Sequence, residues 1–264
     1  MLKLEKISKT FNPGTINEKK ALRGVSLTLE DGDFVTVIGG NGAGKSTLLN
    51  AVAGVWPIDE GTILIDDINL TPLPEHRRAR YIGRVFQDPM MGTAADMWIE
   101  ENMALSARRG ERRTLKRGIT AAEREGYRRA LAGLGLGLED RMTSKVGLLS
   151  GGQRQALTLL MASLKRPRLL LLDEHTAALD PKTAAKVLEA TDRIVSQGNL
   201  TTIMITHNMK DAIAHGNRLI MMHEGQIILD IRGEEKRRLT VDALLRQFER
   251  VSGEEFASDQ ALLS

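Results

Sequence analysis

A glycine-rich segment, residues 39–46 with the sequence GGNGAGKS, constrains the fold of this chain more than any other feature. It matches the phosphate-binding loop pattern G-x-x-x-x-G-K-[ST] without a gap. The β-branched run Val35–Ile38 before it predicts a buried strand, and Lys45–Leu49 begins a predicted helix. A chance glycine-rich turn would not need this flanking pattern. We therefore predict an α/β core built around a phosphate site.

The residue types of this loop suit a chain of phosphates. Glycines let the backbone wrap closely, so that successive N–H groups point at phosphate oxygens, and the following helix adds its positive end. Lys45 can reach the β- and γ-phosphates, and the Ser46 hydroxyl can bind Mg²⁺. A nucleotide hydrolase or a kinase would fit equally at this point. The predicted nucleotide-binding residues of the loop are Gly39, Asn41, Gly42, Ala43, Gly44, Lys45, Ser46 and Thr47.

Apolar patterning elsewhere predicts an α/β architecture. Continuous apolar runs at Leu169–Leu172 and Thr202–Ile205 suit central strands of a parallel sheet, with a helical pattern at Thr183–Val195 between them. We predict further strands at Thr62–Ile65 and Ile82–Phe86. Near the N-terminus apolar and polar residues alternate, as in half-exposed antiparallel strands. The apolar positions of that alternation are Leu2, Leu4, Val25, Leu27 and Leu29.

Residues 88–166 have few strand signals and many Ala, Leu, Glu and Arg, so we predict a helical insertion. The chain 1–264 is then one domain. Residues 1–87 and 167–264 form an α/β core with an N-terminal antiparallel β subdomain, and 88–166 form a helical subdomain. A basic cluster in the insertion suits either acidic partners and phospholipid headgroups or a solvated helical face. Its members are Arg108, Arg109, Arg112, Arg113, Lys116, Arg117, Arg124, Arg128 and Arg129.

Two acidic residues, Asp173 and Glu174, follow the apolar run Leu169–Leu172. The carboxyl end of a parallel strand faces the ligand crevice of such a sheet. Asp173 suits the Mg²⁺ shell, directly or through water, and Glu174 can orient or deprotonate an attacking water. Either acid alone could instead be a helix N-cap or a solvated carboxylate. In a chain that carries a phosphate loop, we predict the functional roles.

The segment Leu149–Gln153, with the sequence LSGGQ, narrows the family. With this segment and its neighbours, the sequence resembles the ATP-binding cassette (ABC) ATPases over nearly its whole length. Further motifs follow the family's order: Gln87 at a strand end, the turn Ala178–Asp180, His207 after a strand, and Phe11 upstream. Each motif alone is weak, but the ordered set is specific.

The resemblance implies the ABC ATPase fold, with a P-loop NTPase core, and ATP and Mg²⁺ as cofactors. It implies that Phe11 stacks on adenine, that Gln87 touches Mg²⁺ or the attacking water, and that His207 holds the γ-phosphate. The implied catalytic residues are Glu174, His207, Gln87 and Lys45. The implied metal-binding residues are Ser46, Gln87 and Asp173.

The resemblance also implies a head-to-tail pair of ATPase subunits, which we predict to be a homodimer with two equivalent sites. A Ser-Gly-Gly sequence before an apolar helical pattern is an anion-binding helix start. ATP on one subunit would be clamped by the Ser150, Gly151, Gly152 and Gln153 segment of the other. Asp180, in the turn after Glu174, is a further implied nucleotide-binding residue. The sequence departs from the family at Phe11, which lacks the commoner tyrosine hydroxyl, at His175, where proline is usual, and at Ala177, where serine is common.

Composition limits the location and the partners that can be expected for this chain. No apolar run approaches the ~20 residues of a membrane-spanning helix, and 37 basic against 34 acidic residues do not indicate nucleic acid as a partner. The absence of cysteine excludes disulfides and a cysteine nucleophile. The resemblance then implies a cytoplasmic ATPase, peripheral on the inner face of the cell membrane. Separate integral-membrane permease subunits would dock near residues 87–102.

Two segments, Phe86–Thr93 and Asp173–Asp180, look like those of a bacterial group in which the cassette serves an importer with a solute-binding lipoprotein. Some members of that group are linked to aromatic amino acids, so we expect a small solute, with an amino acid as one candidate. The alternatives are a soluble assembly ATPase of the iron–sulfur cluster type, an exporter or lipid-handling ATPase, and a non-catalytic nucleotide-binding regulator.

Overall fold

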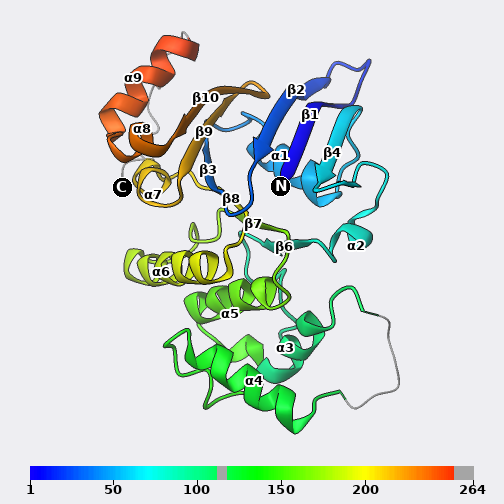
Figure 1. Cartoon of the computed structure of the whole chain (residues 1–264), viewed down its shortest axis with the longest axis vertical. Helices are drawn as coiled ribbons and strands as arrows, with labels where there is room; N and C mark the ends of the chain where they lie inside the picture. The colour runs from blue at the N-terminus through cyan, green and yellow to red at the C-terminus, as the bar shows by residue number, and fades with distance from the viewer. Residues whose placement is uncertain (112–117, 253–264) are drawn as a thin grey trace. The chain divides into compact units, whose positions relative to one another are not determined.

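The computed structural model describes residues 1–111 and 118–252 (Figure 1). These residues form two compact units. The first joins Met1–Arg78 to Asn199–Ser264, and the second is Ala79–Gly198. The division groups residues 79–87 and 167–198 with the helical part of the chain, whereas the sequence predicts a subdomain of 88–166. The predicted subdomain boundaries stay a prediction.

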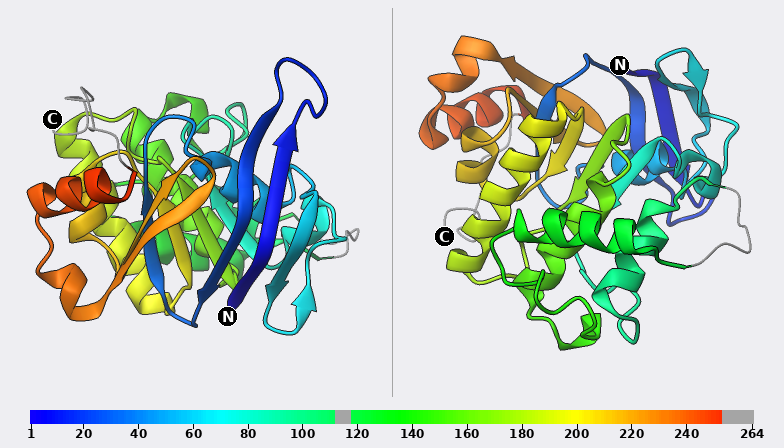
Figure 2. Two further views of the ribbon diagram at one scale, coloured as in Figure 1. Left: turned by 90° about the horizontal axis from the view of Figure 1, so that it is seen from above. Right: turned by 60° about the horizontal axis from the view of Figure 1, so that its bottom comes forward.

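An antiparallel sheet occupies the N-terminal part of the first unit. Its strands lie in the order β2 (Lys19–Leu29), β1 (Leu2–Phe11), β4 (Glu60–Ile65) and β5 (Ile68–Asn69). Figure 2 shows β1, β2 and β4 side by side. Leu2 and Leu4 are buried while Lys3 and Glu5 are exposed, so the predicted alternation is confirmed.

The β1–β2 hairpin ends in a loop that is held by its own hydrogen bonds. The backbone N–H of Gly14 donates to Oε2 of Glu18 at 2.8 Å, and the Thr15 hydroxyl donates to the carbonyl oxygen of Asn12 at 2.8 Å. At the tip, the side chain of Ile16 is fully exposed to solvent. The hairpin thus exposes the apolar Ile16 side chain on a loop that is held by hydrogen bonds.

The second sheet of the first unit is built around β3 (Phe34–Ile38), in which all five residues are buried. β3 is parallel to β8 (Thr202–Ile205) and to β9 (Arg218–His223), and β9 is antiparallel to β10 (Gln226–Arg232). The strands predicted from Val35 and from Thr202 are therefore confirmed. The helices of this unit are α1 (Lys45–Ala53), α2 (Glu75–Arg78), α7 (Met209–Ala214), α8 (Gly233–Arg237) and α9 (Val241–Ser252).

A buried arginine, Arg78, satisfies backbone carbonyls at the end of α1. Its Nη1 donates to the carbonyl oxygens of Ala51 at 2.8 Å and Val52 at 2.9 Å, and its Nε donates to that of Leu73 at 2.8 Å. Burial lowers the pKa of this guanidinium. The last carbonyls of a helix have no partner within the helix, so Arg78 fixes the end of the helix that follows the phosphate loop.

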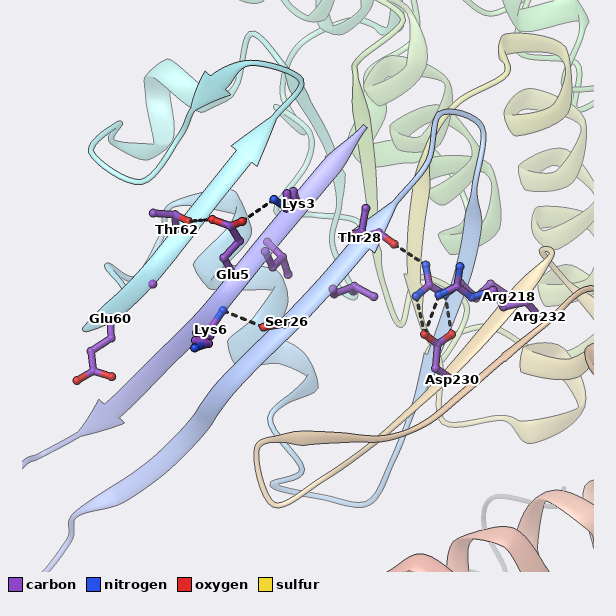
Figure 3. A pocket seen from close by; sticks show the side chains of 13 residues that line it. Lys3, Glu5, Lys6, Ser26, Thr28, Glu60, Thr62, Arg218, Asp230 and Arg232 are labelled. Carbon is purple, nitrogen blue, oxygen red and sulfur yellow. Dashed lines mark hydrogen bonds and ion pairs between the residues drawn. The ribbon is translucent and has the colours of Figure 1, made fainter.

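An open polar cavity of about 870 Å³ lies on the exposed face of the antiparallel sheet, next to β10 (Figure 3). Beside it, Arg218 donates to Oδ1 and Oδ2 of Asp230 at 2.7 and 2.6 Å and to the carbonyl oxygen of Thr28 at 2.5 Å. Arg232 reaches the same Asp230 carboxylate at 3.2 Å. Because Thr28 is on β2 and Asp230 on β10, Arg218 joins the two sheets of this unit.

The second unit combines two parallel strands with helices. β6 (Ile82–Val85) pairs with β7 (Leu169–Asp173), whose four leucines are all buried. Its helices are α3 (Ile99–Ala107), α4 (Ala121–Ala132), the 3₁₀ helix η1 (Val146–Leu148), α5 (Gly151–Ser163) and α6 (Pro181–Gly198). Both predicted strands are confirmed, although β6 ends one residue earlier than predicted. The helix predicted over 183–195 extends further at both ends.

Carboxylates and carbonyls of the second unit bind several members of the basic cluster. The carboxylate of Glu100 is buried and accepts two hydrogen bonds from Arg124, at 2.7 and 2.9 Å. Arg108 pairs with Glu123 at 2.9 Å, and Arg109 donates to the backbone at 3.1 Å. Burial lowers the pKa of Arg109. Of the remaining predicted members, Arg128 and Arg129 lie on α4, whereas Arg112, Arg113, Lys116 and Arg117 lie outside the described residues.

Within the described ranges, no helix is both long and apolar enough to cross a membrane.

Candidate nucleotide-binding site

The glycine-rich loop connects β3 to α1 and needs glycine at its turns. Gly39 and Gly44 have φ of 148° and 101°. A Cβ on Gly44 would lie 2.6 Å from the carbonyl oxygen of Ala21, and one on Gly39 would meet the carbonyl oxygen of Met222. The loop backbone therefore packs directly on β2 and β9, and no larger residue fits at either glycine without a shift.

Lys45 is buried at the start of α1, and its ammonium group lies against the loop. Nζ donates to the carbonyl oxygen of Gly39 at 2.6 Å and to that of Gly40 at 3.2 Å. Ser46 follows in the first turn and is exposed, and that turn holds no acidic residue. The positive end of α1 is thus not neutralised from within its own first turn, which favours an anion at this position.

The turn at Gly225, which the sequence interpretation missed, forms a hydrogen bond with the glycine-rich loop. The backbone N–H of Gly225, between β9 and β10, donates to the carbonyl oxygen of Ala43 at 3.0 Å. The carbonyl of Gly225 accepts from the N–H of Arg23 at 2.9 Å. A Cβ on Gly225 would lie 2.8 Å from the carbonyl oxygen of Ala21. The Glu224-Gly225 pair signals a turn in the sequence, but its contact with the loop depends on the tertiary fold.

Phe11, the predicted adenine platform, ends β1 and is half-buried. Its ring meets that of Trp56 edge to face, with centroids 4.9 Å apart and planes at 83°. The ammonium of Lys9 lies 5.7 Å from the Phe11 centroid and bonds Asp59 at 2.9 Å. Two neighbours that the sequence interpretation missed, Trp56 and Lys9, thus hold the ring in place.

His207 follows β8 and is exposed. The next residue, Asn208, caps α7 by accepting from the backbone N–H groups of Lys210 at 2.9 Å and Asp211 at 3.2 Å. Burial raises the pKa of the Asp211 carboxyl, while the nearby side chains of His215 and His207 act on it in the opposite direction. His207 therefore lies close enough to the partly buried Asp211 carboxyl to affect its pKa.

In the second unit, Asp173 and Glu174 lie at the end of β7. Oδ2 of Asp173 is 3.4 Å from Nη2 of Arg84, whose guanidinium lies 4.6 Å from the Phe86 ring centroid. Glu174 has a φ of 44°, an uncommon value for a residue with a side chain. Its carbonyl oxygen accepts from the N–H of Ala177 at 3.0 Å. Backbone strain of this kind concentrates at functional positions.

The residue after Glu174 is anchored in the core of the second unit. His175 is 2% exposed, and its Nε2 lies 3.0 Å from the hydroxyl of Thr191 on α6. The Thr191 hydroxyl donates to the carbonyl oxygen of Val187 at 2.9 Å, so it accepts from an N–H on Nε2 of His175. His175 thus links the strained backbone at Glu174 to α6.

The Ser-Gly-Gly-Gln segment begins α5. Oγ of Ser150 accepts from the N–H of Gln153 at 3.3 Å, and Oε1 of Gln153 accepts from the N–H of Ser150 at 3.2 Å, which is a capping box. Gly151 and Gly152 pack against Leu179 and Thr183. While it accepts in the cap, the Ser150 hydroxyl keeps its own proton to donate to an anion.

Asp180 caps the start of α6, as Ser150 caps that of α5. Its Oδ1 accepts from the N–H of Thr183 at 3.1 Å. Hydrogen bonds from Thr183 hold the pKa of the Asp180 carboxyl below its usual range, so it stays ionised at neutral pH. The methyl group of Thr183 is also the neighbour that leaves no space for a Cβ on Gly152. The two helix starts therefore pack on each other within this unit.

Gln87 is exposed and lies just beyond β6, next to residues that contact α5. The carbonyl oxygen of Phe86 accepts from Nε2 of Gln155 at 3.1 Å. Arg154 contacts the sulfur of Met90 and donates to the carbonyl oxygen of Gly147 at 3.0 Å. The segment around Gln87 is thus bonded to the helix that Ser150 begins, through two residues that sequence reasoning missed.

The predicted site residues fall into two groups, one on each unit. Phe11, the loop from Gly39 to Thr47, and His207 belong to the first unit. The remainder belong to the second unit, and these are Gln87, Ser150, Gly151, Gly152, Gln153, Asp173, Glu174 and Asp180. Each group has the anion-binding backbone that phosphate recognition needs, at the starts of α1 and α5.

Sequence comparison identifies the family. The model of the family described as ABC transporter matches residues 22–177, more than half of the chain. This chain belongs to the ABC transporter family. The tyrosine transport ATP-binding protein of Clostridioides difficile (strain R20291) is 45% identical to this cassette over 94% of the chain and 99% of its own length. The methionine import ATP-binding protein MetN of Bartonella henselae is 34% identical over 86% of this chain and 64% of its own length.

A solved structure has the same fold as this cassette. A dimeric ATP-binding cassette in a post-hydrolysis state, bound to ADP and Pi, is 28% identical to it with a TM-score of 0.75, over 88% of this chain and 98% of that chain. The predicted ABC ATPase fold, with its parallel and antiparallel sheets, is confirmed. The cassette is an ATP-hydrolysing enzyme. The roles of its individual site residues stay predictions.

Proposed function

We propose that this cassette is the ATP-hydrolysing subunit of a bacterial importer whose solute is an amino acid. The observation that carries the proposal is the 45% identity to a relative named for tyrosine transport, which extends over 99% of that relative. The segments Phe86–Thr93 and Asp173–Asp180 support the same assignment, because they match the importer group recognised from the sequence.

The proposed division of labour follows the chemistry of each side chain. Backbone N–H groups of the glycine-rich loop bind the phosphates, Lys45 contacts the β- and γ-phosphates, and Phe11 supports the adenine. Glu174 orients or deprotonates the attacking water, while His207 holds the γ-phosphate. Gln87 contacts the attacking water and the metal. The positive φ of Glu174 and the buried hydrogen bond of His175 to Thr191 support the role proposed for Glu174, because they fix the backbone from which its side chain extends.

Mg²⁺ is the proposed metal. The donors assigned to it are the Ser46 hydroxyl, the Gln87 amide oxygen and the Asp173 carboxylate, and hard oxygen ligands of this kind suit Mg²⁺. Ser46 is exposed in the first turn of α1, so its hydroxyl is accessible. When bound, Mg²⁺ would neutralise charge that develops on the β- and γ-phosphates.

Two copies of the cassette are proposed to pair head to tail. The segment Ser150, Gly151, Gly152 and Gln153 of one copy would contact the ATP held by the loop of the other, and Asp180 is a further proposed nucleotide-binding residue. The capping box at Ser150 supports this role, because it fixes a helix start with a hydroxyl proton left to donate. Closure of the ATP-bound pair would drive the permease, and hydrolysis would reset it.

The proposed partners are integral-membrane permease subunits and a solute-binding lipoprotein, with the cassette on the inner face of the membrane. A test is to purify the tagged chain from its native membrane in mild detergent and identify the co-purifying proteins. We expect a polytopic permease and a lipoprotein. A permease without a binding protein would favour an exporter or lipid-handling ATPase, and no membrane partner would favour an assembly ATPase.

Uptake measurements identify the solute. The purified complex, reconstituted in liposomes with ATP inside, is expected to take up a labelled amino acid, with tyrosine, tryptophan and phenylalanine as the first candidates. A complex carrying Glu174→Gln serves as the control, because it should bind ATP without transport. Uptake of none of the twenty amino acids by an ATPase-active complex would refute the substrate class while leaving the ATPase assignment intact.

A further inference from the structure

Two adjacent lysines begin β2, and only one of them shares a face with the predicted adenine platform. In the β1–β2 pairing, Lys19 lies opposite Phe11 and Lys20 opposite Thr10. Directly paired residues of antiparallel strands lie on the same face, and successive residues alternate faces. Lys19 is therefore on the Phe11 face of the hairpin and Lys20 on the other. Both side chains are exposed.

The ammonium group of Lys19 reaches the phosphate loop. A Cβ built on Gly42 would lie 3.2 Å from Nζ of Lys19. Within 4 Å of that position, and apart from the loop residues next to Gly42, Nζ is the one heavy atom that the described residues supply. Gly42 has a φ of 79° and is exposed. The charge of Lys19 thus lies beside the exposed backbone of Gly42 in the phosphate loop.

The charge of Lys19 is not compensated by a neighbouring acid. In the described part of the chain, Lys19 makes no ion pair or side-chain hydrogen bond. Its neighbour Glu18 accepts from the N–H of Gly14 at 2.8 Å, within the hairpin loop. By contrast, Lys9 is paired with Asp59, and Lys45 is bonded to loop carbonyls. An unpaired cation beside a loop of N–H donors attracts an anion.

We propose that Lys19 is a second phosphate-binding cation of this cassette, acting on the α- and β-phosphates of the bound nucleotide. This inference rests on the proposed nucleotide site. The backbone of Lys19 is paired with that of Phe11 at the adenine end, and its ammonium group reaches Gly42 at the phosphate end. Lys45 is assigned to the β- and γ-phosphates, so the two lysines act on different parts of the phosphate chain.

The contact between Lys19 and the phosphates should have a measurable effect on nucleotide affinity. A charge-assisted hydrogen bond between an exposed ammonium and a phosphate should strengthen binding by roughly five- to tenfold. The contact is made in the ground state as well as in the transition state, and it does not involve the γ-phosphate. We therefore expect Lys19 to lower the KM for ATP without raising kcat by more than about twofold.

The test compares three variants of the full-length protein. Lys19→Met removes the charge and keeps the length of the side chain, Lys19→Arg keeps the charge, and Lys20→Met is the matched control on the opposite face. Dissociation constants for ATP, ADP and adenosine are measured by calorimetric titration, and thermal unfolding checks that each variant is folded. We expect Lys19→Met to weaken ATP and ADP binding alike, by roughly five- to tenfold, and to leave adenosine binding unchanged. Lys19→Arg and Lys20→Met should stay within twofold of wild type.

Several results would overturn the inference. Wild-type affinity for ADP in Lys19→Met would mean that the ammonium does not touch the phosphates. An equal loss in Lys20→Met would indicate a general effect of surface charge, and a loss for ATP but not for ADP would place the contact on the γ-phosphate. If the wild-type protein itself showed no saturable ATP binding, the proposed nucleotide site would fail before the role of Lys19 is reached.

Discussion

Replacement of Arg218 by methionine should destabilise the first unit by about 3 kcal/mol. The substitution removes two hydrogen bonds to Asp230 and one to the carbonyl oxygen of Thr28 (Figure 3). Breaking a buried ion pair by deleting one partner costs about 3–5 kcal/mol. The side chain of Arg218 is 3% exposed, but that of Asp230 is 32% exposed, so water takes up part of the lost pairing. The lower end of that range is therefore expected.

The same carboxylate supplies the control. Arg232 contacts Asp230 at 3.2 Å, but its side chain is 61% exposed. Exposed pairs contribute about 0–1 kcal/mol, so Arg232→Met should leave the unfolding midpoint almost unchanged. With a urea dependence of about 2–3 kcal/mol per molar, Arg218→Met should lower the midpoint by about 1–1.5 M. The two variants differ mainly in the burial of the deleted guanidinium.

Tryptophan fluorescence can follow the unit concerned. The chain has two tryptophans, Trp56 in the first unit and Trp98 in the second. In a Trp98→Phe background, Trp56 alone reports unfolding of the first unit. If Arg218→Met and Arg232→Met lower the urea midpoint equally, or if Arg218→Met lowers it by less than about 0.5 M, the buried ion pair does not stabilise this unit as argued.

The effect of Arg218 should also depend on pH. Hydrogen bonds from Arg218, followed by that from Arg232, hold the pKa of Asp230 below its usual range. The folded pKa lies below the unfolded value of about 3.9, so the stabilisation is fully present above that value and is lost as pH falls through the folded pKa. The gap between wild type and Arg218→Met should therefore narrow below about pH 4. A constant gap from pH 7 to pH 3 would contradict this assignment.

The remaining predictions concern the site. Glu174→Gln should keep ATP affinity and reduce turnover by about 10²–10⁴-fold, with the ATP-bound dimer detected by size-exclusion chromatography; wild-type hydrolysis would exclude Glu174 as the base. Thr191→Val should leave Nε2 of His175 without its partner and lower the free energy of unfolding by about 1–3 kcal/mol. It should also lower kcat, whereas Thr191→Ser, which keeps the hydroxyl, should not. Equal kcat in the two variants would mean that His175 does not position Glu174. Gly44→Ala should abolish measurable ATP binding, because its Cβ would lie 2.6 Å from the carbonyl oxygen of Ala21; an unchanged dissociation constant would mean that the loop tolerates the shift.

The sequence predicts those parts of the fold that follow from local patterns. The strand Val35–Ile38, the glycine-rich loop and the helix after it are neighbours in the chain, and each has a clear signature. The leucine run of β7 is equally plain. The strands β9 and β10 were not predicted, and in β9 the segment Arg218–His223 holds two methionines and a single β-branched residue.

Contacts between distant segments escaped the sequence interpretation. Gly225 supports Ala43 although 182 positions separate them in the chain, and Arg154 contacts Met90 across 64. His175 was recognised as a departure from the family pattern, but its bond to Thr191 depends on how α6 packs. Motif spacing identifies the side chains that could act on a nucleotide. The residues that hold them in position are found only from the fold.

The hairpin between β1 and β2 also offers a place for an optical reporter. Its loop is held by internal hydrogen bonds, and the Ile16 side chain at its tip contacts solvent on all sides. The chain has no cysteine, so Ile16→Cys would create a unique thiol for a fluorophore without any other substitution. The two strands that meet at this loop end in Phe11 and Lys19, the residues assigned to the adenine and the phosphates. A dye at position 16 would therefore convert nucleotide binding into a fluorescence change in an otherwise native protein.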